Sequence, residues 1–188
     1  EVAYLILNGE LPNKKQLKDF ERQERKERKL SKTLLQDIKN FPKKAHPMDV
    51  ARTAVSIMGL EDKETKDNST KANMRKVMRI FAKTPVALAA FYRSRKGKKI
   101  ISPKSNLSFS ENFFYMCFGK VPNEDIVKAF DVSLILYAEH SFNVSTFTAR
   151  TITSSLSDIH GAITGAIASL KGPLHGGANE EVMHMMNK

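Results

Sequence analysis

The chain has 188 residues, a formal net charge of +11 and 41% hydrophobic residues. A chain of this length can bury one sizeable core, and none of its apolar runs approaches the ~18 residues that span a bilayer, so we expect a globular protein without a membrane partner. The single cysteine, Cys117, excludes an internal disulfide and suits a reducing, cytoplasmic compartment. Cys117 stands among aromatic residues, which favours a buried, inert thiol over a catalytic one.

The positive charge is concentrated in two segments of different character. In residues 14–35, acidic residues alternate with basic ones at helical spacing, as in Glu21 with Arg25, and Glu24 with Arg28. This spacing is typical of a solvated helix face. The segment 93–99 carries basic residues without an acidic one, and such a loop can meet the phosphates of a nucleic acid or a coenzyme. No zinc spacing or other nucleic-acid motif accompanies it, so we expect no nucleic-acid partner.

The N-terminal half is predicted to form helices that Gly and Pro separate. After a short first helix, Asn13 can cap a long helix that runs to about Lys39, where Phe41-Pro42 breaks it. Residues 49–58 carry apolar side chains on one face, with Gly59 as the stop signal.

The remaining residues predict further helices of the same kind. They comprise a helix opened by Ser69 or Thr70 and kinked at Pro85, a short helix ended by Gly119, a long helix over residues 125–142, and a Gly- and Ala-rich helix over residues 158–170. Alternating strand patterns and internal repeats are absent from the sequence. The predicted fold class is therefore mainly α, without a significant sheet.

The segment YAEHSFNVSTFTAR, residues 137–150, departs from a plain amphipathic helix because polar side chains interrupt its apolar face. A buried polar group without a partner costs ~1–3 kcal/mol, so such a cluster must be hydrogen-bonded or bind something. His140 and Asn143 share a helix face if the helix persists that far. Two interpretations follow, namely a helix end whose polar residues cap one another and a ligand site.

The segment GPLHGGANE, residues 172–180, places His175 on a tight turn just before a helix. The positive end of the helix dipole disfavours the imidazolium, so we expect a neutral ring that can donate one hydrogen bond, as the polarisation of a carbonyl requires. The alternative is a loop histidine without a functional role. Gly176 and Gly177 permit a sharp turn and a close approach, and Asn179 or Glu180 can start the next helix.

Together, GPLHGGANE and the upstream EHSFNVSTFTAR closely resemble the citrate synthase family. The blocks EVAYLILNGELP, AHPMDVARTAVS and LSDIHGAITGAIASLKGP extend the resemblance over nearly the whole chain. It implies that residues 1–188 are part of the multi-helical large domain of such an enzyme. It also implies a condensation of an acyl-CoA with oxaloacetate by a homodimer, with the acyl-CoA as substrate and with no metal or separate cofactor.

The resemblance also assigns roles to individual residues. His175 corresponds to the catalytic histidine that stabilises the charge on the enol or enolate oxygen of the thioester. His140 matches an oxaloacetate-binding histidine, with Asn143, Ser145 and Arg150 around it. Gly176, Gly177 and Asn179 shape the site.

Two parts of the family's site are missing from this sequence. They are a Phe-Gly-His-Arg motif that contacts oxaloacetate and the catalytic aspartate on a smaller domain. Glu139, Glu180 and Glu181 do not match the motif of that aspartate. We therefore expect half of an active site and no synthase activity from this chain alone.

The acyl substrate is indicated by the stretch YAEHSFN, which resembles the 2-methylcitrate synthases through Tyr137 and Glu139. This resemblance implies propionyl-CoA, with citrate synthase and acetyl-CoA as the alternative, because a pocket distinguishes one methylene by only ~1–3 kcal/mol. An interpretation of another class is a non-catalytic helical dimerisation fragment. Its candidate contact surfaces are the helix over residues 158–170 and the helix around Pro85.

Overall fold

The computed structural model describes residues 1–186, and within that range it contains ten α-helices and no β-strand. The prediction of a mainly α fold is therefore confirmed. The helices are α1 (Val2–Asn8), α2 (Lys14–Glu27), α3 (Lys32–Asn40), α4 (Pro47–Glu61), α5 (Thr70–Arg95), α6 (Phe109–Phe118), α7 (Glu124–Tyr137), α8 (Val144–Thr153), α9 (Ile159–Leu170) and α10 (Gly177–Met186).

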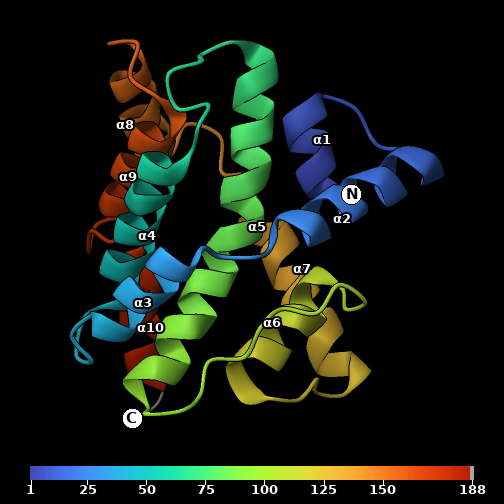
Figure 1. Cartoon of the computed structure of the whole chain (residues 1–188), viewed down its shortest axis with the longest axis vertical. Coiled ribbons are helices and arrows are strands. Elements are labelled where there is room, and N and C mark those ends of the chain that lie inside the picture. The colour runs from blue at the N-terminus through green and yellow to red at the C-terminus, as the bar shows by residue number, and fades with distance from the viewer. Residues whose placement is uncertain (187–188) are drawn as a thin grey trace.

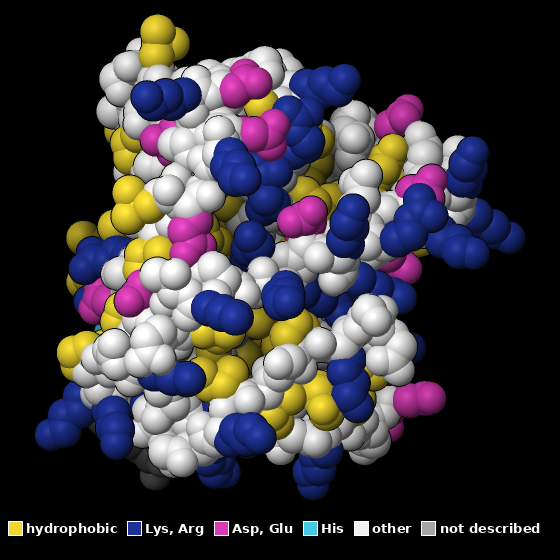
Figure 2. Space-filling model, in the orientation of Figure 1, with side chains coloured by type: hydrophobic (Ala, Val, Ile, Leu, Met, Phe, Trp, Pro, Cys, Tyr) yellow, Lys and Arg dark blue, Asp and Glu magenta, His cyan; other side chains and the backbone are white. Residues whose placement is uncertain are grey.

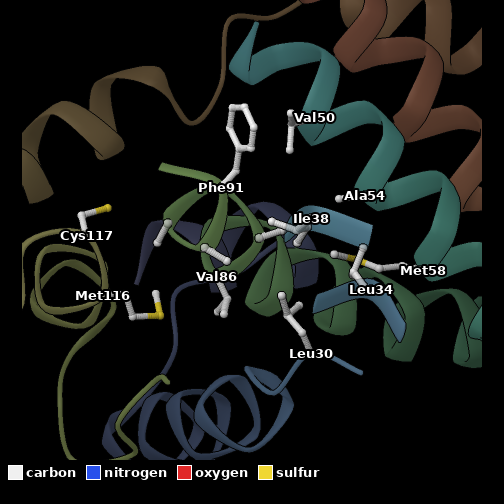
Figure 3. Packing of buried hydrophobic residues seen from close by; sticks show 13 residues of the cluster. Leu30, Leu34, Ile38, Val50, Ala54, Met58, Val86, Phe91, Met116 and Cys117 are labelled. Atoms are coloured by element: carbon white, nitrogen blue, oxygen red, sulfur yellow. The ribbon is translucent and has the colours of Figure 1, made fainter. Parts of the chain in front are cut away.

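The long helix α5 lies at the centre of the molecule, between α4, α8 and α9 on one side and α6 and α7 on the other (Figure 1). Pro85 lies inside α5 without ending it. Figure 3 shows the buried side chains that surround this helix. They come from α3, α4, α5 and α6 and from the connection between α2 and α3, and they include Leu30, Leu34, Ile38, Val50, Met58, Val86, Phe91, Met116 and Cys117. Full burial of such a side chain contributes about 1.5–3 kcal/mol, so this cluster is the main source of stability.

Several predicted helix boundaries are confirmed, because they depend on local side chain to backbone hydrogen bonds. Asn13 and Gln16 form a capping box at the start of α2. Ser69 caps α5, and Gly119 ends α6 in the left-handed conformation that favours glycine, with φ of 82°.

Other boundaries differ from the prediction. The long helix expected to run to Lys39 is two helices, because the Ser31 hydroxyl accepts a hydrogen bond from the Leu34 N–H (2.9 Å) and starts α3. Gly59 does not end α4, which continues to Glu61. A Cβ at Gly59 would lie 2.9 Å from the Cβ of His160, so this glycine allows α9 to pack closely on α4.

The expected solvated face of α2 is also corrected. Glu21 and Arg25 form the expected surface pair at 3.4 Å, but Glu24 and Arg28 are buried. Arg28 donates to the Glu24 carboxylate at 2.6 Å and to the carbonyl oxygen of Lys104 at 2.8 Å. This buried pair holds α2 against the segment before α6, and each charge is hydrogen-bonded as burial requires.

On the face shown in Figure 2, basic side chains are spread widely and are interspersed with acidic ones. In the basic segment 93–99, Arg93 donates to the carbonyl oxygen of Cys117 at 3.1 Å, and the Lys96 ammonium lies 4.3 Å from the centroid of the Tyr92 ring. These cations therefore contact the protein itself. Within residues 1–186, no helix is both long enough and apolar enough to cross a membrane.

The thiol of Cys117 is buried against α5, as predicted. Burial raises its pKa to about 11, because the interior disfavours the thiolate. This environment agrees with the expectation of an unreactive thiol.

The surfaces considered for dimer contacts are used within the chain. Helix α9 packs against α4, α8 and α5, and α5 contacts α2, α3, α4 and α6. Packing within the protomer therefore accounts for the small residues of α9 and for most of α5.

Candidate active site

Five helix ends meet at a pocket of about 690 Å³. They are the starts of α4, α8 and α10 and the ends of α7 and α9. The side chains and backbone that line the pocket belong to His46, Met48, Tyr137, His140, Asn143, Ser145, Leu170, Lys171, His175, Gly176, Gly177 and Glu180. A volume of this size accommodates a small-molecule ligand.

His175 lies in the turn between α9 and α10, immediately before the first helical residues of α10. Its Nε2 is 2.7 Å from the Oγ of Ser145, which belongs to the first turn of α8. Its backbone N–H donates to the carbonyl oxygen of Gly172 at 3.0 Å. The half-buried ring is therefore oriented by a specific partner in the pocket.

The glycines beside His175 allow a close approach of backbone to backbone. A Cβ at Gly176 would lie 2.6 Å from the carbonyl oxygen of Leu170, and a Cβ at Gly177 would lie 2.9 Å from the carbonyl oxygen of Lys171. Neither has a positive φ. The turn thus folds back onto the end of α9, and any larger residue would displace it.

Helix α10 begins at Gly177, before the expected start at Asn179 or Glu180. The side chain of Asn179, predicted to shape the site, lies outside the described part of the structure.

The polar cluster after α7 divides into a loop and a new helix. Helix α7 ends at Tyr137, so His140 lies in the connecting loop, with its ring centroid 5.8 Å from that of Tyr137. Asn143 caps α8 by accepting a hydrogen bond from the Thr146 N–H at 2.8 Å, and it also lines the pocket. The capping and ligand-site interpretations of this residue are therefore compatible. The sequence analysis missed α8 as a separate helix, although Asn143 is a good N-cap signal.

Arg150 is not brought to the pocket that contains His140 and His175. It is exposed on the last turns of α8 and lines a separate surface hollow with Phe142, Thr146 and Phe147. Arg150 lies seven residues, or about two helical turns, after Asn143, so it is displaced by roughly 10 Å along α8 from the helix start that lines the pocket.

Sequence reasoning missed His46 and Lys171. His46 caps α4, and its Nε2 lies 3.0 Å from a carboxylate oxygen of Glu180. Lys171 donates to the carboxylate of Asp49 at 2.6 Å. The only local signal was His46-Pro47, a cap followed by proline at the first helical position.

These contacts set the charge state of the two carboxylates. The hydrogen bond from His46 lowers the pKa of Glu180 below its usual range, and the hydrogen bond from Lys171 does the same for Asp49. His140, His175, Lys171 and the helix starts give the pocket hydrogen-bond donors that suit an anionic or carbonyl ligand. Among the described residues, no group of three or more His, Cys, Asp or Glu side chains is placed to hold a metal ion.

The fold is all-helical over the described residues, and three histidines line one pocket where helix ends converge. Comparison with known proteins identifies the family. The family model described as the citrate synthase C-terminal domain matches residues 1–188. The chain therefore belongs to the citrate synthase family.

Relatives named 2-methylcitrate synthase and relatives named citrate synthase both match the chain. A 2-methylcitrate synthase from Corynebacterium glutamicum is 53% identical over 99% of this chain and 50% of its own length. A 2-methylcitrate synthase from Mycobacterium tuberculosis and a citrate synthase from Mycolicibacterium smegmatis are each 49% identical over 99% of this chain, which is 47% and 49% of their lengths. The chain thus spans about half the length of the curated relatives that it matches.

Solved structures give the same result for the fold. The crystal structure of citrate synthase from Thermotoga maritima aligns with a TM-score of 0.89 and 38% identity, covering 100% of this chain and 48% of its own. A ternary complex of the citrate synthase from Thermoplasma acidophilum with carboxymethyl coenzyme A and oxaloacetate aligns with a TM-score of 0.88 and 29% identity, covering 95% of this chain and 46% of its own.

Proposed function

We propose that this chain supplies one part of the active site of an acyl-CoA:oxaloacetate C-acyltransferase. The observation that carries the proposal is the pairing of His175 with Ser145 in a pocket that also contains His140. Residues 1–188 then form part of the large helical domain of the complete enzyme, in the reducing cytoplasmic compartment that the single buried cysteine suits.

In this proposal His175 acts as a neutral hydrogen-bond donor. The Ser145 Oγ and the His175 Nε2 lie 2.7 Å apart. We assign the hydroxyl as the donor of this hydrogen bond, which leaves the proton of the neutral ring on Nδ1. In the proposed complex the Nδ1–H donates to the oxygen of the acyl thioester. When a base removes a proton from the α-carbon, negative charge develops on this oxygen, and a donor already in place stabilises it.

Oxaloacetate is proposed to bind at the other side of the pocket. His140 lies in the loop before α8, and Asn143 is held at the start of that helix. Imidazole and amide donors near a helix start suit the carboxylates and the ketone of this substrate. The enolate carbon then attacks the ketone carbon, and water hydrolyses the thioester to release coenzyme A and the condensed acid.

The base is not assigned to any residue of this chain. Glu180 is the carboxylate that lines the pocket, but its hydrogen bond from His46 lowers its pKa, which is opposite to what a general base near neutral pH needs. We therefore expect the 188-residue chain to show no turnover by itself.

The proposed acyl substrate is propionyl-CoA, with acetyl-CoA as the alternative. Tyr137 lines the pocket beside His140, as expected for a residue that affects the substrate. Glu139 instead accepts a hydrogen bond from the backbone N–H of Ser141 and stabilises the local turn. Tyr137 therefore supports the 2-methylcitrate synthase proposal more directly than Glu139 does.

The test is an assay of coenzyme A release by the complete protein with oxaloacetate and each acyl-CoA. We expect oxaloacetate-dependent release, with a higher kcat/KM for propionyl-CoA than for acetyl-CoA. A preference for acetyl-CoA would support the citrate synthase alternative. Absence of release with both substrates would contradict the proposed function.

We also propose that the complete enzyme is a homodimer. Large hydrophobic side chains on α7 are exposed in the protomer, including Ile126, Val132, Ile135 and Leu136. Size-exclusion chromatography with light scattering measures the mass directly. A complete protein that is dimeric but releases no coenzyme A would favour helical dimerisation as the role of this segment.

A further inference from the structure

We propose that the first turn of α4 positions His175 by holding both ends of the segment that carries it. His46 and Asp49 are then positioning residues. The inference rests on the proposed function, because it concerns the orientation of the histidine that the proposed reaction uses.

Two contacts join the first turn of α4 to the segment 171–180. Asp49 accepts a hydrogen bond from Lys171 at 2.6 Å, four residues before His175. His46 pairs with Glu180 at 3.0 Å, five residues after it. We call these two pairs the α4 contacts. They bring together residues 122 and 134 positions apart in the chain, so they constrain the segment relative to the core helix α4.

The orientation of the His46 ring follows from its hydrogen bonds. The backbone N–H of Met48 donates to Nδ1 at 3.1 Å, so Nδ1 is an acceptor and the ring proton of the neutral form is on Nε2. Nε2–H therefore donates to the Glu180 carboxylate. A single neutral tautomer satisfies both the helix cap and the contact with α10, which makes the contact directional.

Between the α4 contacts, the backbone of the segment is internally hydrogen-bonded. Gly177 N–H donates to the carbonyl oxygen of Gly172 at 3.1 Å, and Ala178 N–H donates to that of His175 at 3.2 Å. Such a segment moves as a unit when its ends move. Displacement of either end therefore changes the 2.7 Å approach of His175 to Ser145.

The test uses the 188-residue chain with ¹⁵N-labelled histidine, because ring nitrogen chemical shifts report tautomer and hydrogen bonding without substrate. Glu180→Ala removes one α4 contact, and Glu181→Ala is the matched control on the exposed neighbouring position. We expect the ring nitrogens of both His46 and His175 to shift in Glu180→Ala, with roughly two- to five-fold faster amide exchange at Gly177, as the loss of a half-exposed hydrogen bond to a carboxylate allows. Glu181→Ala is expected to change neither.

Two further variants keep the test decisive. Glu180→Gln retains an oxygen that accepts from His46, so it is expected to restore the His175 signals. Lys171→Met breaks the other contact without a change in α10, and it is expected to shift His175 even if Glu180→Ala does not fold.

The proposal is overturned if the His175 ring nitrogens move no further in Glu180→Ala and Lys171→Met than in Glu181→Ala. It is also overturned if only stability falls while the His175 signals keep their positions. Failure of the proposed function would look different. The complete protein would then lack oxaloacetate-dependent release of coenzyme A, while the spectra still showed His175 coupled to the α4 contacts.

Discussion

The region of α3, α4 and α5 and the region of α7 and α8 are stabilised in different ways. The first contains the buried core, whereas no residue of α7 or α8 is buried. The pocket lies between these regions, and its polar groups are held by caps and hydrogen bonds at helix ends. The difference shows that packing provides most of the stability, while directional polar contacts set the geometry of the site.

The largest expected effect on stability comes from replacing a leucine by alanine, and the same replacement is made once in each region. Leu34 is 1% exposed in α3 and Leu136 is 69% exposed in α7. Leu34→Ala should lower the free energy of unfolding by about 2–5 kcal/mol, because it loses burial and leaves a cavity. Leu136→Ala should change it by less than about 0.5 kcal/mol. Urea denaturation measures both.

If Leu136→Ala proves costly, the dependence of that cost on protein concentration shows its cause. A large cost of Leu136→Ala that grows with protein concentration would mean that a second copy covers α7. A large cost of Leu136→Ala that is the same at all concentrations would contradict the distinction between the two regions.

The next effect concerns the turn at the site. Gly176→Ala should destabilise the protein by about 1–3 kcal/mol, because its Cβ would lie 2.6 Å from a backbone oxygen that cannot rotate away. Gly172→Ala is the matched control, with its nearest atom 3.2 Å away. Denaturation and the ring signals of His175 measure the two consequences. A Gly176→Ala variant with unchanged stability and unchanged His175 signals would refute the close approach.

A pH-dependent effect is expected at the contact of α4 with α9. His160 is 2% exposed, and burial lowers its pKa although Asp62 and Asp158 lie 3.5 and 3.6 Å from its ring. Below about pH 6.5 the unfolded state therefore binds a proton that the folded state does not, so stability falls as pH falls, by at most about 1.4 kcal/mol per unit. His160→Gln should reduce this slope.

The exposed His184 provides the control for this slope. His184→Gln removes a histidine whose side chain is 65% exposed, and it should leave the slope unchanged. Urea denaturation over roughly pH 5 to 7.5 gives the free energy of unfolding of the unsubstituted protein, His160→Gln and His184→Gln. Equal slopes in His160→Gln and the unsubstituted protein would contradict the assignment.

The parts of the fold that could be predicted from the sequence depend on neighbouring residues. Caps such as Asn13 and Ser69 act over three residues, and their helices start where expected. The end of α4 was mispredicted. Gly59 does not end this helix but allows α9, which is distant in the sequence, to pack closely against it. Local patterns carry no information about such a contact.

The same distinction applies to the site. His140, Asn143 and His175 were found by their motifs, and the fold brings them to one pocket. His46 was missed because its partner is 134 residues away and only the fold shows the pair. The structure places Arg150 beside a hollow separate from the pocket, and its expected role in binding oxaloacetate stays a prediction.

The smallest expected effect is that of Arg150→Ala. The side chain is exposed and lines a hollow separate from the pocket, so its removal should change stability by less than about 0.5 kcal/mol and the affinity for oxaloacetate by less than about two-fold. His140→Ala removes a donor that lines the pocket and should weaken binding by roughly ten-fold, as loss of a hydrogen bond to a charged group does. Calorimetric titration of both variants with oxaloacetate makes the comparison. Equal weakening by the two substitutions would mean that the substrate reaches beyond the pocket to the outer face of α8.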